Sequence, residues 1–221
     1  MNNRKICVII CSNNRMYLEE CTLYLNRLIV PEGYELNLLV IEDATSMCAG
    51  YNEAMGATDA AIKIYMHQDT FITDIHFLQE IVDIFKLDRN IGMIGIAGVP
   101  RMPEDGVMWH AERVFAQYYR DNCDIAKCTE YISVMPQMLR DVDAVDGFLM
   151  VTSVDIPWRQ DIFDGWDFYD ASMSYEMRAK GYRVVVPVLG KPVCVHDDGM
   201  ILNLDSYDKY RERFLKEYAS K

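Results

Sequence analysis

The chain has 221 residues, of which 51% are hydrophobic and 11% aromatic, enough to bury the core of one domain. Its formal net charge of −12 disfavours a nucleic acid or an anionic membrane surface as the main partner, because nothing offsets the long-range repulsion. The apolar run at residues 6–11 is too short for a signal-peptide core or a membrane span, which predicts a cytoplasmic protein without a transmembrane segment.

The seven cysteines are an odd number scattered through apolar surroundings, which predicts reduced thiols that act as small hydrophobic residues. Cys123 and Cys128 lie near His110, but a second pair of ligands with zinc-site spacing is missing from the sequence. The cysteines therefore give little support to a zinc site.

The first hundred residues alternate between two kinds of pattern. Apolar runs without alternation predict strands buried on both faces, at residues 6–10, 36–41, 62–66 and 91–98. Helical spacing between these runs puts apolar residues on one face in two groups: Leu18, Cys21, Leu25 and Leu28, and Leu78, Ile81, Val82 and Phe85. Strand alternating with helix predicts an α/β fold with a mostly parallel sheet flanked by helices.

The pattern is less regular over residues 100–142, which we interpret as an excursion covering one side of a site, with an aromatic helical stretch at 109–120. Sheet-like sequence returns at residues 144–153 and 182–188. The chain then ends in an amphipathic helix with a row of aromatic residues, Tyr207, Tyr210, Phe214 and Tyr218. This helix could dock on the core or on a second copy, so a homo-oligomer stays open.

Polar side chains follow three successive predicted strands. They are Ser12, Asn13 and Asn14 after the first, Glu42 and Asp43 after the second, and His67, Gln68 and Asp69 after the third. Ligands of open α/β sheets bind beyond the carboxyl ends of the strands. The sequence therefore predicts one ligand site at this edge.

Several stretches, in this order, resemble the GT-A glycosyltransferases of inverting family 2, in particular a small bacterial glycosyltransferase-like branch: "CVIICSNNR", "LLVIEDATS", "YNEAM", "YMHQD", "VDGFLMVTS", "GWDFYDASMSYEMRAKGYRVVV" and "CVHDDG". The resemblance implies a single GT-A domain, with residues 1–99 binding a nucleotide-sugar, 100–199 carrying the acceptor and catalytic half, and 200–221 a terminal helix. It also implies transfer of a sugar, with a UDP-sugar the expected donor, to a saccharide or other hydroxyl acceptor.

Carried over residue by residue, the resemblance gives a donor-binding group of Ser12, Asn13, Asp43, Asn52 and Gln68. Asp43 would accept from the nucleotide base, although a turn-forming role is the alternative for an aspartate in "EDATS". Capping of the following helix is the alternative for Ser12 and Asn13, and an ordinary helix start is the alternative for Asn52.

The third strand would end in the place of a DxD motif, whose last carboxylate holds a divalent cation on the donor diphosphate. This makes Asp69 the expected metal ligand and His196 a further one, with Mn²⁺ better suited than Mg²⁺ to an imidazole and a carboxylate. A structural role is the alternative for His196, because a lone histidine in an apolar run is more often a satisfied core residue. His67 is expected to pack or to support the ligands, and Gln68 departs from the motif because an amide replaces a carboxylate.

Inversion requires a base for the acceptor hydroxyl, and the family register gives Asp170, with Asp167 as the rival. Capping of the next helix is a compatible role for Asp170. Tyr169 stands where the family often has glutamate. Contacts to substrate are expected from Asp146, Gly147 and Trp166, and aromatic stacking on a sugar also from Trp158 and Trp109, although the core is the commoner place for tryptophan. Gly147 would allow close backbone approach, and an ordinary strand glycine is the equal alternative.

Two other classes of protein compete with this interpretation. The departures at Gln68 and Tyr169 would fit a nucleotide-sugar-binding module that has lost turnover. A nucleotidyltransferase is disfavoured because "SNNR" after the first strand contains no glycine-rich phosphate loop, and a dinucleotide-binding dehydrogenase lacks its GxGxxG motif for the same reason.

Overall fold

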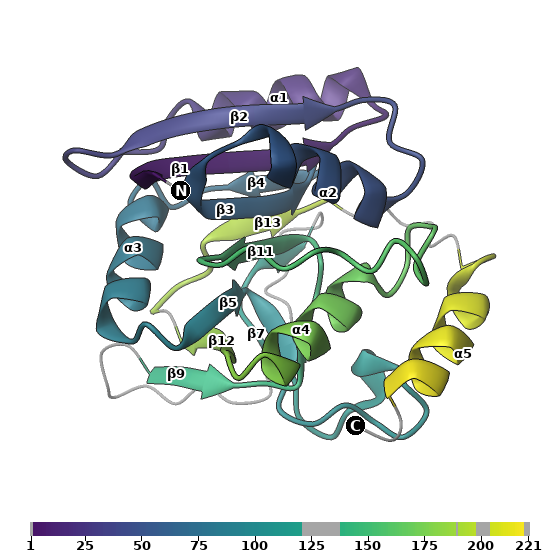
Figure 1. Ribbon diagram of the computed structural model, residues 1–221. Coiled ribbons are helices and arrows are strands. Elements are labelled where there is room, and N and C mark those ends of the chain that lie inside the picture. Colours follow the sequence, from purple (N-terminus) through teal and green to yellow (C-terminus); the bar gives the residue numbers. More distant parts are fainter. Residues whose placement is uncertain (1, 121–137, 189, 198–203, 219–221) are drawn as a thin grey trace.

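The computed structural model describes residues 2–120, 138–188, 190–197 and 204–218 (Figure 1). A seven-stranded sheet forms its centre, in the order β2 (Glu35–Ile41), β1 (Asn2–Cys11), β3 (Ala60–His67), β11 (Leu149–Thr152), β5 (Ile91–Gly95), β12 (Arg183–Val188) and β9 (Met138–Asp141). Strands β11 and β9 run against their neighbours, and the others share one direction. The expected α/β fold with a mainly parallel sheet is confirmed.

Helices cover both faces of this sheet (Figure 1). Helices α1 (Arg15–Leu25) and α3 (Phe77–Leu87) pack on one face, whereas α2 (Met47–Ala57), α4 (Tyr169–Ala179) and α5 (Tyr207–Tyr218) pack on the other. Successive side chains of β1 alternate between the two cores, so that Val8 is buried against the first and Ile9 against the second. Burial on both faces explains the apolar runs of β1, β3 and β5. The same expectation for the run at 36–41 is wrong, because β2 is an edge strand and none of its residues is buried.

Two small sheets extend the central one. One joins β10 (Ala144–Val145), β6 (Ala97–Val99) and β7 (Phe115–Ala116), and the other joins β4 (Thr70–Ile72), β13 (Cys194–His196) and β8 (Tyr119–Arg120). The run at 91–98, predicted as one strand, is therefore split between β5 and β6, and the run at 144–153 is split between β10 and β11. Each break lets the chain leave the central sheet and pair elsewhere.

The predicted aromatic helix at 109–120 is wrong. This stretch contains only the end of a 3-10 helix (Met108–His110) and the short strands β7 and β8. Their pairing with β6 and β13 supplies backbone hydrogen bonds, while Ala116 and Tyr118 are buried in the core. Tertiary pairing thus overrides the local helical spacing. Cys123 and Cys128 lie outside the described residues.

Helix α5 docks on the core of its own chain. Tyr210, Phe214 and Tyr218 are buried, and the Phe214 ring packs 5.4 Å from the ring of Phe168. The Ser172 and Tyr218 hydroxyls are hydrogen bonded at 3.0 Å, which ties α5 to α4. The aromatic row of this helix is therefore used within the domain.

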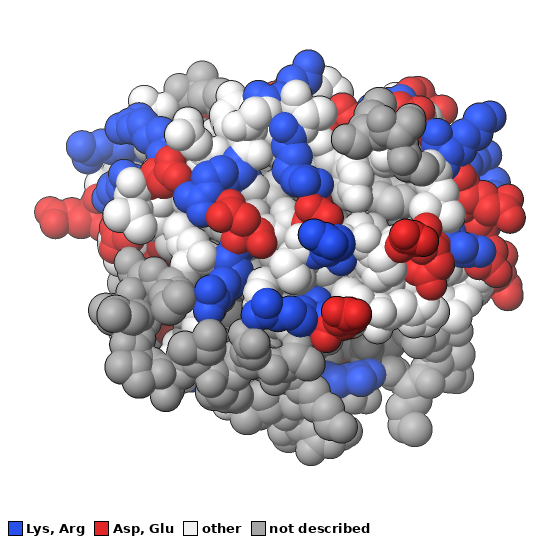
Figure 2. All heavy atoms as spheres, turned by 90° about the horizontal axis from the view of Figure 1, so that it is seen from below, with Lys and Arg blue, Asp and Glu red and all other residues white. Residues whose placement is uncertain are grey.

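The face seen from below carries lysine and arginine side chains interspersed with aspartate and glutamate (Figure 2). The net charge of −12 is thus not expressed as a uniformly acidic surface on this face. No helix in the described part of the chain is long and apolar enough to cross a bilayer. The described cysteines, Cys7, Cys11, Cys21, Cys48 and Cys194, are free thiols, as expected.

Candidate active site

The candidate site begins where β3 ends. His67 is the last residue of β3, and Asp69 lies in the turn that leads into β4. Strand β13 pairs antiparallel with β4, setting His196 opposite Thr70, and the Asp197 amide donates to the Asp69 carbonyl at 2.9 Å. This pairing brings His196, which is 127 positions after Asp69 in the sequence, to the end of β3.

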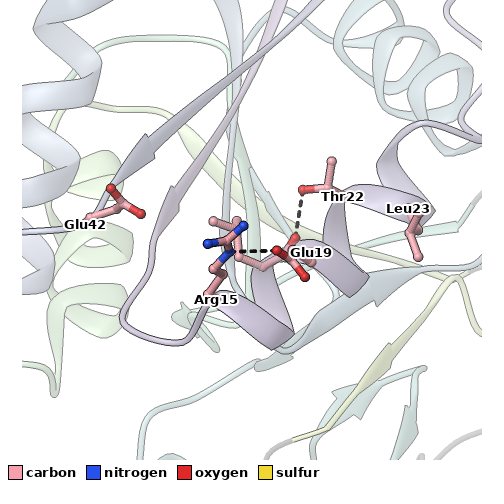
Figure 3. A pocket seen from close by; sticks show the side chains of 6 residues that line it. Arg15, Glu19, Thr22, Leu23 and Glu42 are labelled. Carbon is pink, nitrogen blue, oxygen red and sulfur yellow. Dashed lines mark hydrogen bonds and ion pairs between the residues drawn. The ribbon is translucent and has the colours of Figure 1, made fainter.

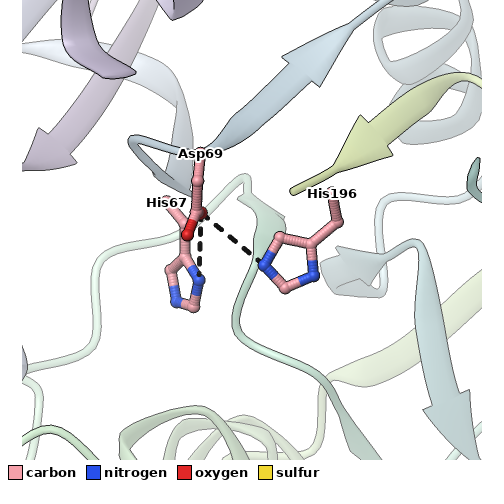
Figure 4. A group of neighbouring side chains, drawn as sticks. All are labelled: His67, Asp69 and His196. Carbon is pink, nitrogen blue, oxygen red and sulfur yellow. Dashed lines mark ion pairs between the residues drawn. The ribbon is translucent and has the colours of Figure 1, made fainter. Parts of the chain in front are cut away.

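The three side chains converge on one point (Figure 4). The Asp69 Oδ1 atom lies 3.8 Å from His67 Nδ1 and 3.6 Å from His196 Nε2, and one ligand atom of each residue lies within 4.8 Å of the others. Asp69 Oδ1 is buried, yet it accepts no hydrogen bond from the described residues. A buried acceptor left in this state is costly unless something else binds it, so the set fits a divalent cation.

The electrostatic environment favours the forms of these groups that bind metal. Burial lowers the pKa of His67, which favours the neutral imidazole. Burial alone would raise the pKa of Asp69, but the neighbouring His196 and His67 outweigh it, so that the pKa falls below its ordinary value. The Phe148 ring stacks on the His196 ring at 4.6 Å and fixes its orientation.

Gln68 organises the loop between β1 and α1. Its Oε1 atom accepts from the Ser12 hydroxyl at 2.8 Å and from the amides of Asn13 and Asn14 at 3.1 and 2.9 Å. Its Nε2 atom donates to Asn13 Oδ1 at 2.6 Å. The capping role weighed for Ser12 and Asn13 belongs to Asn14, whose side chain accepts from the first turn of α1. A carboxylate could accept the same bonds but could not donate the last one.

Tyr169 joins helix α4 to the end of β3. Its hydroxyl lies 2.5 Å from His67 Nε2. A Cβ atom on Gly147 would lie only 2.0 Å from this hydroxyl, so glycine is required there for the tyrosine to fit. In the described structure the space beside Gly147 is thus filled by the Tyr169 side chain.

Asp170 follows Tyr169 in the first turn of α4. The helix begins after Phe168, whose φ of 62° is in the left-handed region, a strained conformation for an aromatic residue. Burial and then the charge of Asp146 raise the pKa of Asp170 to about 7, against the opposing amides of Ala171 and Gly147. The Ala171 amide donates to Asp170 Oδ1 at 2.7 Å. Such a pKa suits a proton acceptor near neutral pH.

Three other predicted site residues, Asp167, Asp43 and Asn52, have surroundings of their own. The rival base Asp167 accepts a 2.5 Å hydrogen bond from the Ser206 hydroxyl, and Asp43 is exposed after β2. The Asn52 amide is engaged with the Trp158 backbone, donating to its carbonyl at 2.9 Å and accepting from its amide at 2.8 Å.

The three tryptophans differ in exposure. Trp158 is buried, whereas Trp166 and Trp109 are 50% and 49% exposed. The first therefore belongs to the core, and only the other two have surface to offer a ligand.

A separate surface hollow lies on the outer side of α1 (Figure 3). It is lined by Arg15, Leu18, Glu19, Thr22, Leu23 and Glu42. Arg15 and Glu19 form an ion pair across one turn of the helix at 2.7 Å. Of the polar residues predicted at the ligand edge, only Glu42 lines this hollow, and none of the residues assigned to the donor, the metal or the base does. The hollow therefore gives no support to the predicted ligand site.

Two members of the site were not assigned to it from the sequence. His67 was expected only to pack or to support the ligands, yet its Nδ1 atom faces Asp69 as closely as His196 does, within 0.2 Å. Tyr169 was noted as a departure from the family and not as a contact of His67. Its aromatic character gave no signal of this contact, which depends on how α4 meets β3.

These features define an α/β domain of the GT-A class, and the comparisons with known proteins agree. The chain belongs to a family described as glycosyltransferase-like, whose profile matches residues 7–218. No curated protein sequence matches the chain.

Solved structures of glycosyltransferases share the fold at low sequence identity. TarS from S. aureus with UDP covers 96% of this chain at 10% identity with a TM-score of 0.59, over 65% of its own chain. The mannosyltransferase PcManGT from Pyrobaculum calidifontis with GDP-Man and Mn²⁺ covers 99% at 13% identity with a TM-score of 0.58, again over 65% of its own chain. GalNAc-T7 with UDP, GalNAc and Mn²⁺ covers 99% of this chain at 10% identity with a TM-score of 0.55, over 57% of its own chain. The chain thus spans less than two thirds of the length of each of these solved chains.

Proposed function

We propose that this protein transfers a sugar from a nucleotide diphosphate-sugar to a hydroxyl acceptor with inversion, with Asp170 as the base and a divalent cation held by Asp69 and His196. The observation that carries the proposal is the group of His67, Asp69 and His196 at the end of β3, because its central carboxylate oxygen is buried and accepts no hydrogen bond within the described structure.

The donor would lie across the carboxyl ends of β1, β2 and β3, where open α/β sheets bind their ligands. Ser12 and Asn13 lie in the loop that Gln68 holds against β3, so Gln68 would act on the donor by fixing this loop. Asp43 is exposed at the end of β2 and could accept from a nucleotide base. A UDP-sugar is the expected donor, in keeping with the UDP in the TarS and GalNAc-T7 structures. Residues 1–99 would thus serve the donor.

The chemistry of transfer needs both charge neutralisation and a base. A divalent cation at Asp69 and His196, Mn²⁺ or Mg²⁺, would offset the negative charge that develops on the leaving diphosphate. Asp170 would take the proton of the acceptor hydroxyl as its oxygen attacks the anomeric carbon. The amide of Ala171 holds this carboxylate in one orientation. Residues 100–199 would supply the acceptor side, with Asp146, Gly147 and Trp166 near the sugars.

The test is a panel of nucleotide-sugars with Mn²⁺ and purified protein, scored by release of nucleoside diphosphate. Asp170→Asn should abolish transfer while nucleotide affinity stays nearly unchanged, and Asp167→Asn serves as the matched control. Transfer by Asp170→Asn at close to the wild-type rate would reassign the base. If no donor is bound, hydrolysed or transferred, the proposed activity is wrong.

A nucleotide-sugar-binding module without turnover is the second candidate. The observation that favours it is Tyr169, a buried phenol where the related enzymes often place a carboxylate. Tight nucleotide binding with no hydrolysis or transfer across many acceptors would favour this module over the enzyme.

A further inference from the structure

The two ring nitrogens of His67 face different partners. Nδ1 lies 3.8 Å from Asp69 Oδ1, on the side where the three ligand atoms converge. Nε2 lies 2.5 Å from the Tyr169 hydroxyl, on the side of helix α4. An imidazole that binds a metal through one nitrogen carries its hydrogen on the other, and an acceptor for that hydrogen fixes the tautomer and the orientation of the ring.

Tyr169 is well placed to be that acceptor because it has little freedom to move. Its side chain is buried, with an exposure of 4%, and its hydroxyl occupies the space that a side chain at Gly147 would fill. The Tyr51 ring meets it edge-on at 5.8 Å, and the Trp158 ring lies 6.2 Å away. The phenol oxygen is therefore held at one position beside His67.

We infer that Tyr169 is a positioning residue that makes His67 a metal ligand, by accepting from Nε2 and leaving the Nδ1 lone pair directed at the point shared with Asp69 and His196. The inference rests on the metal site of the proposed function and adds a third ligand and its support. A phenol can play this part because its oxygen accepts a hydrogen bond.

The inference has two consequences. Two imidazoles and one carboxylate form a set that suits Mn²⁺ and later transition metals better than Mg²⁺, which prefers oxygen ligands. Tyr169 also directly precedes Asp170, so the hydrogen bond to His67 links the metal ligands to the helix that carries the proposed base.

The test compares Tyr169→Phe with Tyr51→Phe, using Mn²⁺ alone as the probe in isothermal titration calorimetry. Both variants remove one buried hydroxyl from the same aromatic cluster, and the Tyr51 hydroxyl has no hydrogen-bond partner among the described residues. Loss of the partner of a ligating histidine typically weakens metal binding by about 10- to 100-fold. We expect this loss for Tyr169→Phe, an equal or larger loss for His67→Ala, and no change for Tyr51→Phe.

A second readout uses the metal-free protein. The ¹⁵N shifts of the His67 ring should report one tautomer in the wild type and in Tyr51→Phe, and a mixture in Tyr169→Phe. Thermal melting checks that each variant is folded.

The outcomes separate this inference from the proposed function. If the wild type binds Mn²⁺ and Tyr169→Phe binds it equally well, the inference is overturned while Asp69 and His196 remain candidate ligands. The same holds if His67→Ala keeps full affinity. If the wild type binds no Mn²⁺, the metal-dependent function falls and the inference falls with it.

Discussion

Replacing Asp170 by asparagine should stabilise the fold while it abolishes transfer. Burial and the charge of Asp146 raise the pKa of Asp170 from its ordinary value of 3.8 to about 7. The folded state therefore disfavours the ionised carboxylate, which the unfolded chain tolerates. Asparagine removes this charge and keeps an oxygen that can still accept from the Ala171 amide, which donates at 2.7 Å. If Asp170 is the base, as proposed, its ionised form lowers the stability of the fold for the sake of activity.

The magnitude follows from linkage between protonation and folding. A carboxyl group whose pKa is raised by folding does not lower the stability at a pH below its pKa in the unfolded chain. The loss of stability grows as the pH rises from that pKa to the pKa in the folded state. Above the folded-state pKa the loss is complete and stays constant. The full cost is at most about 4 kcal/mol, and the cost at pH 5 is about 1–2 kcal/mol. The advantage of Asp170→Asn should therefore grow between pH 4 and about pH 7 and stay constant above.

Urea unfolding followed by circular dichroism at pH 4, 5, 7 and 8.5 measures this difference. The reasoning is refuted if Asp170→Asn destabilises the protein at every pH, or if its advantage does not change with pH. Asp167→Asn is the control, because it removes the charge of a nearby carboxylate that accepts a hydrogen bond from the Ser206 hydroxyl.

Three further substitutions test other parts of the site. Gln68→Ala should destabilise the protein by about 1–3 kcal/mol, because it frees the donors of the loop after β1, and should weaken nucleotide binding; unchanged urea unfolding and affinity would contradict this. Gly147→Ala should lower the free energy of unfolding by about 1–3 kcal/mol, because the new Cβ would collide with the Tyr169 hydroxyl. Unchanged urea unfolding would contradict this and show that the Tyr169 side chain can move aside. Asp146→Asn should move the rising limb of the pH–rate profile to lower pH, because it removes the second cause of the raised pKa of Asp170; an unmoved limb would argue against this coupling.

Much of the fold can be predicted from the sequence, because a strand buried on both faces gives a continuous run of apolar residues. The run around Val8 is apolar at every position, and the run around Ile64 is apolar except at Lys63; Val8 and Ile64 are both buried in the central strands. The polar residues after them then fall at the carboxyl edge. This is why Asp69 could be placed at that edge from its position in the sequence, whereas its proposed metal role came from the resemblance to a family.

Other features depend on contacts between distant segments, which leave no local pattern. The pairing of β13 with β4 carries His196 to Asp69, and only the resemblance to a family suggested it beforehand. The stretch at 109–120 has helical spacing, yet strand pairing decides its structure. The hydrogen bond between Tyr169 and His67 joins residues 102 positions apart, so no local sequence pattern around either residue could predict it.

Gln68 shows a different limit. From the sequence it is the residue that weakens a metal-binding motif, because an amide replaces a carboxylate. In the structure it makes four hydrogen bonds to the loop at Ser12, Asn13 and Asn14. Its side chain is used to hold the loop, and imidazoles on either side of Asp69 would complete the proposed ligand set.

The most direct test of the central claim is the affinity for UDP measured by calorimetry with and without Mn²⁺, in the wild type and in Asp69→Asn. The account predicts that Mn²⁺ strengthens UDP binding to the wild type by at least about tenfold, and that the substitution removes this gain while it leaves metal-free binding intact. Equal UDP affinity with and without Mn²⁺ in the wild type, or a full Mn²⁺ effect in Asp69→Asn, would contradict it.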